Sequence, residues 1–172
     1  MAVSATPAIA QHHAHADHHS HQIVHAHNSP YAGMQSRPIK ALSEEQIAGL
    51  RDGKGMAMAM PAELNGYPGP LHVLELATQL SLSEEQIART EQLFAEMRHQ
   101  ARTAGEEIIV AEQELDVLFR DKKADPDTVS SAVTKAALAQ GKLRDVHLRY
   151  HLDMVDVLSA EQISAYNKLR GY

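Results

Sequence analysis

The sequence predicts an all-α fold, a long antiparallel helical hairpin flanked by short helices. Three observations lead to this prediction. The phrase LSEEQI occurs at 42–47 and at 82–87, and it returns as LSAEQI at 158–163. After the second copy, apolar residues recur at alternating spacings of three and four, the period of a helix face. From residue 37 onward Ala, Leu, Glu, Gln and Lys are frequent, and β-branched runs are few.

The repeated phrase has the pattern of a helix start. In each copy a Ser precedes a Gln by three residues, which is the capping box that satisfies free amide groups at a helix N-terminus. The flanking Leu and Ile can close over the first turn as a hydrophobic staple. The phrase therefore predicts helices that begin near Ser43, Ser83 and Ser159. It contains no nucleophile, metal ligand or phosphate cradle.

Two short helices should precede the hairpin. The first runs from Ser43 to about Asp52, where Gly53 and Gly55 end it. Residues 56–70 are interrupted by Pro and Gly, so we expect an irregular or briefly helical crossover there. Pro70 suits the first position of another short helix, PLHVLELATQL.

The hairpin itself follows from two long periodic segments. A helix should run from Ser83 to about residue 120, and the turn at Asp125-Pro126 should begin the next one. So short a loop requires the two helices to lie antiparallel. The residues expected at their shared seam are Ile87, Thr90, Phe94, Met97, Ala101, Ala104, Ile108, Ala111, Leu115 and Leu118, facing Val129, Val133, Ala136, Gln140, Leu143, His147, Tyr150 and Met154. Because several of these are Ala and aromatic residues are few, the buried area is limited and we expect a homodimer.

Composition divides the chain into a His-rich tail, residues 1–36, and a helical domain, residues 37–172. The tail has no Lys or Arg and one acid, Asp17, yet it holds eight of the twelve histidines. They are His12, His13, His15, His18, His19, His21, His25 and His27. Imidazole binds Ni, Co, Cu and Zn, and a flexible chain can gather several rings around one ion. The alternatives for the tail are a solubilising leader or a purification tag.

Several classes of function are excluded or disfavoured. The net charge of −6 and the lack of a basic stripe argue against nucleic acid as the main partner. The absence of Cys rules out disulfides and thiolate metal sites. No catalytic Ser/His/Asp set, Gly-rich phosphate loop or carboxylate pair is apparent, so we expect a protein that is not an enzyme.

The first ten residues bear on location. Ala8-Ile9-Ala10 before Gln11 has the small-x-small form of a signal peptidase site. Our hypothesis is that residues 1–10 are the remnant of a signal cleavage region and that the protein works in the bacterial periplasm. The alternative is a plain Ala/Ser leader.

Histidines and methionines in the helical domain are candidate metal ligands. His147 and His151 are four residues apart on a helix, so both rings share a face and can chelate one ion, with Met154 one turn further. The alternative is that they are structural. MAMAM places Met56, Met58 and Met60 at a period of two, and thioethers are soft ligands for Cu(I) or Ag(I). On a helix Met58 would point away from the other two, which favours packing over a copper site.

The domain resembles the Spy/CpxP/ZraP group of periplasmic stress proteins, which includes the CnrX-type nickel and cobalt sensors. Their Leu-Thr-x-x-Gln signature is similar to the Leu-Ser-x-x-Gln copies here, and ELNGYPGPLHVLELA and HLRYHLDMVDVLSAEQISAYNKLRGY are the most specific matches. The resemblance implies a hooked all-α hairpin that forms a dimer. It also implies that His147 and His151 match ligand positions on the last long helix. His72 matches the first of two His on the short helix, while Leu76 replaces the second and Glu75 lies nearby.

From these residues and this resemblance we expect a periplasmic protein of heavy-metal sensing or resistance. Its ligand would be a divalent transition metal, Ni, Co, Cu or Zn, held by His147, His151, His72, Glu75 and Met154 and collected by the tail. The alternative is an ATP-independent chaperone that binds unfolded client proteins, with metal binding incidental. An inner-membrane sensor or regulator is a further candidate partner, which no residue identifies.

Overall fold

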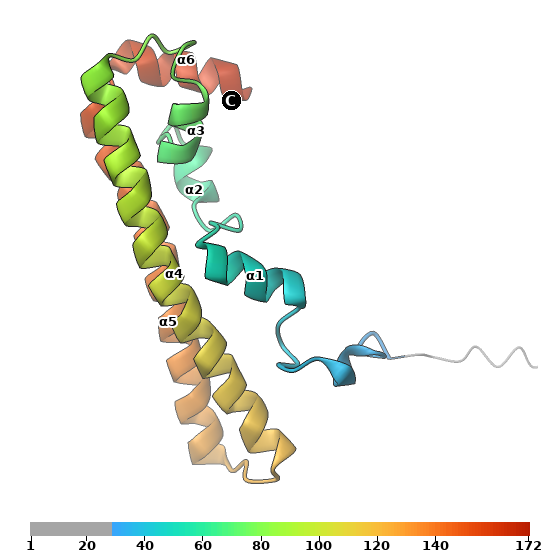
Figure 1. Cartoon of the computed structure of the whole chain (residues 1–172). Helices are drawn as coiled ribbons and strands as arrows, with labels where there is room; N and C mark the ends of the chain where they lie inside the picture. The colour runs from blue at the N-terminus through green and yellow to red at the C-terminus, as the bar shows by residue number, and fades with distance from the viewer. Residues whose placement is uncertain (1–28) are drawn as a thin grey trace, which may run out of the picture. The chain divides into compact units, whose positions relative to one another are not determined.

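The computed structural model describes residues 29–172, and Gly33–Tyr172 form one compact unit. Every regular element among these residues is a helix, which confirms the predicted all-α class. In chain order they are η1 (Met34–Ser36), α1 (Glu44–Asp52), α2 (Met60–Glu63), α3 (Pro70–Glu75), α4 (Glu84–Arg120), α5 (Pro126–Val157) and α6 (Ala160–Arg170). The two long helices, α4 and α5, run side by side as the predicted antiparallel hairpin (Figure 1). Within the described residues, no helix is both long enough and apolar enough to cross a membrane.

The three repeated phrases begin helices as predicted. Ser43, Ser83 and Ser159 each accept a hydrogen bond from the backbone amide of the Gln three residues later, and that Gln side chain accepts one from the Ser amide. Two of the phrases also contact each other: the side-chain amides of Gln86 and Gln162 are paired, at 2.8 and 3.0 Å. The capping boxes therefore also fix the start of α6 against the start of α4.

The hairpin seam follows the predicted register with two corrections in α5. Val133 is 49% exposed and Gln140 is exposed as well, whereas Ala136 and Ala139 are buried. Gln140 instead reaches from the edge of the hairpin to the carboxylate of Glu112, at 3.3 Å. A long polar side chain is more stable at such an edge, and the small Ala139 takes the position between the helices.

The short helices before the hairpin position the site described below. α1 packs against α4 through Gly105, where an added Cβ would stand 2.4 Å from the carbonyl oxygen of Leu50. Gly53 ends α1 in the left-handed conformation, and α2 provides the brief helix predicted in the crossover. α3 begins at Pro70 as predicted but ends at Glu75, because the chain turns before Leu80.

Candidate metal-binding cavity

A cavity of about 610 Å³ lies between the short helices and the hairpin. We call it the histidine cavity, because three histidines line it: His72 of α3, and His147 and His151 of α5. The rest of its wall comes from the segment between α1 and α3, from the side chains of α4 near Met97, and from Tyr172. The structure thus brings together residues from distant parts of the chain.

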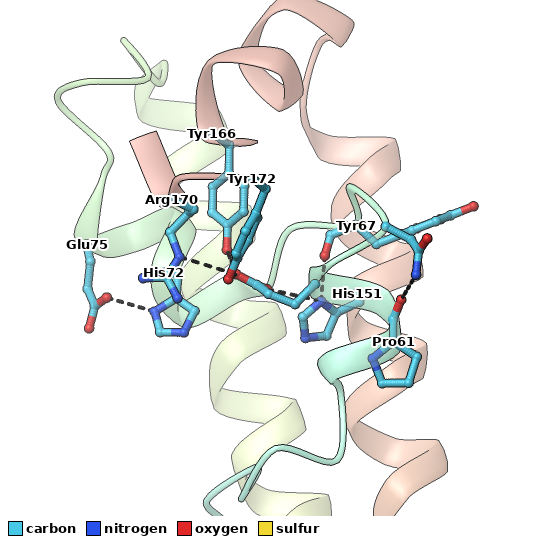
Figure 2. A network of polar contacts seen from close by, with 10 residues as sticks. Pro61, Tyr67, His72, Glu75, His151, Tyr166, Arg170 and Tyr172 are labelled. Atoms are coloured by element: carbon cyan, nitrogen blue, oxygen red, sulfur yellow. Dashed lines mark hydrogen bonds and ion pairs between the residues drawn. The ribbon is translucent and has the colours of Figure 1, made fainter. Parts of the chain in front are cut away.

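His151 is held in one orientation by the backbone. The residue is 7% exposed, and Nδ1 donates a hydrogen bond to the carbonyl oxygen of Tyr67 at 2.7 Å (Figure 2). A carbonyl oxygen can only accept, so Nδ1 carries the hydrogen, and the lone pair of the neutral ring is on Nε2. A ring fixed in this way by its other nitrogen is the usual arrangement of a metal-binding histidine.

His147 lies one turn earlier and is more deeply buried, at 3% exposure. Its Nε2 is shielded from solvent and has no hydrogen-bond partner within residues 29–172. Burial, followed by the charge of His151, lowers the pKa of His147 below its ordinary value of 6.5. The ring is therefore neutral at neutral pH, which is the form that binds metal. Burying such a nitrogen without a partner costs about 1–3 kcal/mol.

His72 is the third histidine of the cavity, and Glu75 supports it. The Nδ1 of His72 lies 2.9 Å from Oε2 of Glu75, and both side chains are partly exposed (Figure 2). This contact places the hydrogen of the neutral ring on Nδ1 and leaves Nε2 free. Glu75 is absent from the cavity wall, so its position is that of an orienting group behind His72.

The remaining predicted site residues lie elsewhere. Met154 is fully buried in the apolar core, away from the cavity wall. Leu76, at the position where the resemblance implies a second histidine, packs against the same core. The eight tail histidines lie outside the described residues. Within the described residues, no three His, Asp or Glu side chains are grouped closely enough to hold one metal ion.

Sequence reasoning missed Glu63, a carboxylate in the cavity wall that four other side chains approach. Its side chain is 12% exposed and accepts hydrogen bonds from the hydroxyl of Tyr166 and, at 3.4 Å, from that of Tyr172. Arg170 contributes an ion pair at 3.3 Å, and Nδ1 of His151 lies 3.8 Å away (Figure 2). The signal in the sequence was weak, because ELNGY was recognisable only as part of the resemblance and names no partner for its Glu.

Residues 55–165 match a family model described as heavy-metal resistance. The chain belongs to this heavy-metal resistance family. The matched range includes the hairpin and His72, His147 and His151, and membership agrees with the resemblance noted above at the level of the family. No curated protein and no solved structure gives a significant match.

In this heavy-metal resistance protein the methionines of MAMAM divide between two environments. Met56 and Met60 line the histidine cavity, while Met58 packs against the core. Met56 and Met58 lie in a turn before α2, so this separation does not come from the helical spacing considered above. Met97 of α4 lines the same cavity and is buried. The spacing in the sequence indicated that Met56 and Met60 could act together. That Met97 lies in the same cavity could be seen only in the structure.

Proposed function

We propose that this chain binds a transition-metal ion in the histidine cavity, with His147 and His151 as its first two ligands, as its part in heavy-metal resistance. The observation that carries the proposal is the buried Nε2 of His147, which has no hydrogen-bond partner among the described residues. A folded protein seldom keeps an unpaired buried nitrogen without a functional reason. In the tautomer that carries its hydrogen on Nδ1, this nitrogen has a lone pair that a metal ion would accept.

The two rings are suited to act together. They are one helical turn apart on α5 and line the same cavity, so little reorganisation is needed for chelation. His147 is kept neutral by burial, and His151 is oriented by Tyr67. His72, oriented by Glu75, is the third imidazole in the cavity wall and would approach when an ion is bound.

The wider setting is part of the proposal. The His-rich tail would collect ions and pass them to the cavity, in a periplasmic homodimer that senses or buffers metal. The small-x-small pattern at Ala8-Ile9-Ala10 supports export, and exposed apolar side chains on the hairpin support self-association. Sensing would require that the metal-bound form differs in shape or stability from the free form.

The decisive experiment uses the full chain with its eight tail histidines replaced by Ser, here called the tail-Ser chain. Calorimetric titration with Zn, Ni, Co, Cu and Ag(I) should find at least one metal that binds at about one ion per chain and raises the melting temperature. The variant His151→Asn should lose binding, because the Asn amide can still donate to Tyr67 but offers no ligand nitrogen. His99→Asn, at an exposed position of α4, is the matched control and should bind normally. Equal binding by the His151→Asn variant would disprove the site.

A chaperone role is the second candidate, and exposed apolar side chains favour it. Leu138 is 70% exposed and Val110 is 47% exposed, and both line a shallow groove of the hairpin beside Glu107 and Lys142. Such a mixed surface can hold an unfolding client. If this role dominates, suppression of client aggregation should persist in chelator and in the His151→Asn variant, and should weaken in Leu138→Gln.

A further inference from the structure

We infer that the histidine cavity is a site for a soft monovalent ion, Cu(I) or Ag(I), in which the thioethers of Met56, Met60 and Met97 complete the coordination begun by two imidazoles. The inference rests on the proposed function, since it takes His147 and His151 as ligands. It goes further by naming the class of ion. Four structural observations support it.

The first observation is the number of hard or borderline ligands. Zn usually takes four protein ligands in a structural site and at least three in an open one. No three His, Asp or Glu side chains of residues 29–172 are grouped closely enough to supply them. Two imidazoles therefore leave such an ion short of ligands. Cu(I) and Ag(I) are satisfied by fewer ligands and accept sulfur.

The second observation is the sulfur in the cavity wall. Met56 and Met60 enter from the segment between α1 and α2 and from the first turn of α2, and Met97 enters from α4. Thioether ligands select Cu(I) over the harder divalent ions. The chain has no Cys, so thioethers are its only soft donors. Met56 and Met60 are 40% and 51% exposed, which leaves an ion a path to the buried imidazoles.

The third observation is the backbone that carries Met56. Met56 and Ala57 both have positive φ, at 41° and 64°. This left-handed conformation costs about 1–2 kcal/mol per residue for non-glycine residues, and such strain is concentrated at functional sites. Gly49 leaves room for the sulfur, because an added Cβ there would lie 2.9 Å from Sδ of Met56. The strained turn places Met56 in the cavity wall, and Gly49 of α1, which is outside that wall, accommodates its sulfur.

The fourth observation is the charge of the cavity wall. Its acidic residues are Asp52 and Glu63, and its basic residues are Lys54 and Arg98, so the formal charges cancel. Lys54 pairs with Asp52 at 3.6 Å, and Glu63 is already engaged by Tyr166 and Arg170. Transfer of a divalent ion into such a site costs more than transfer of a monovalent ion, because both carboxylates that the described residues supply to the wall are already paired and do not offset the second charge.

Methyl NMR of the full chain tests the inference at individual residues. The seven methionines, labelled with carbon-13 at the ε-methyl, can be assigned by single Met→Leu substitutions. Ag(I), which needs no reductant, should shift the methyls of Met56, Met60 and Met97 and leave those of Met58 and Met154 in place. Binding of Ag(I) to the tail histidines does not obscure this result, since the methyl signals that are read belong to methionines of the cavity wall. Unshifted Met56 and Met60 signals at saturating Ag(I) would overturn the inference.

Affinity measurements separate this inference from the proposed function. In the tail-Ser chain, the double variant Met56→Leu with Met60→Leu should lose about tenfold or more in affinity for Ag(I), and for Cu(I) in anaerobic competition with a chromophoric chelator. Met58→Leu is the matched control. If His151→Asn abolishes Zn or Ni binding while the Met double variant binds Ag(I) like its parent, the proposed function stands and the inference is wrong. If neither Ag(I) nor a divalent ion binds the cavity, both fail.

Discussion

Tyr166, in the last helix, donates its hydroxyl hydrogen to the carboxylate of Glu63, 103 residues earlier in the chain. The Tyr166 side chain is fully buried, and Arg170 from the next turn of α6 pairs with the same carboxylate. Glu63 ends α2 and lies 3.8 Å from His151, so α6 is fastened to the wall of the histidine cavity. The C-terminal helix therefore helps to shape the proposed metal site without contributing a ligand.

Removing this hydroxyl should destabilise the fold. In Tyr166→Phe the Glu63 carboxylate loses a buried donor, which should lower the free energy of unfolding by about 1–3 kcal/mol. Urea denaturation of the metal-free chain measures the change. Tyr172→Phe is the control, because the Tyr172 hydroxyl is 3.4 Å from the same oxygen and its side chain is half exposed. Equal decreases in the free energy of unfolding of the two variants would show that the Tyr166 hydrogen bond stabilises the fold no more than the Tyr172 contact does.

The same contact should make stability depend on alkaline pH. Burial raises the pKa of Tyr166 above its ordinary value of 10.0, and the hydrogen bond to Glu63 raises it further. The folded chain then keeps a proton that the unfolded chain releases above pH 10, so this contribution to stability is fully present below about pH 10 and is lost as the pH rises. The stability difference between wild type and Tyr166→Phe should therefore shrink as the pH rises above about 10. A constant difference would contradict the prediction.

The features that could be predicted from the sequence are those that neighbouring residues along the chain determine. The capping boxes at Ser43, Ser83 and Ser159 involve residues three apart, and the shared cavity face of His147 and His151 follows from their spacing of one helical turn. Each was predictable because local geometry determines it. The confirmed antiparallel hairpin followed from two periodic segments and the short turn between them.

What could not be predicted depends on contacts between distant segments. The Glu63–Tyr166 bond joins residues with no local signature, and Met97 enters the histidine cavity only because α4 passes beside the segment between α1 and α2. The wrong assignment of Gln140 to the seam has the same origin. Heptad spacing accepts either Gln140 or Ala139, and the packing of α5 on α4 decides between them.

Replacement by Ala should change the stability of the protein in opposite directions at two helical glycines. Gly105→Ala would place a Cβ 2.4 Å from the Leu50 carbonyl oxygen, so α1 must move away from α4, at a cost of about 1–3 kcal/mol. At Gly141, in the interior of α5, an added Cβ would meet nothing within 4 Å. Gly141→Ala should therefore stabilise the protein by about 0.5–1 kcal/mol, because alanine favours the helix. Denaturation of both variants beside wild type measures the two shifts, and destabilisation by Gly141→Ala would contradict the prediction.

A second pair of glycines allows the proposed metal site to be tested by adding a methyl group beside each histidine, without changing a ligand. Gly69 precedes α3 with φ −91° and ψ 144°, a conformation that alanine adopts readily. An added Cβ there would lie 2.8 Å from Cε1 and 3.0 Å from Nε2 of His151, so the ring must shift while its bond to Tyr67 resists. At Gly55 an added Cβ would lie 3.5 Å from Nδ1 of His147, which is an ordinary contact.

The two variants should separate in calorimetric titrations of the tail-Ser chain. Gly69→Ala moves the His151 lone pair from its place and should weaken metal binding by about tenfold or more, the usual effect of disturbing a group that orients a ligand. Gly55→Ala should bind like its parent, since His147 keeps its position. The imidazole resonances of His151 should shift in Gly69→Ala alone, which links the loss of affinity to this ring. Unchanged affinity in Gly69→Ala would place the metal away from Nε2 of His151, because no ligand displaced by a Cβ at 3.0 Å can hold its ion unaltered.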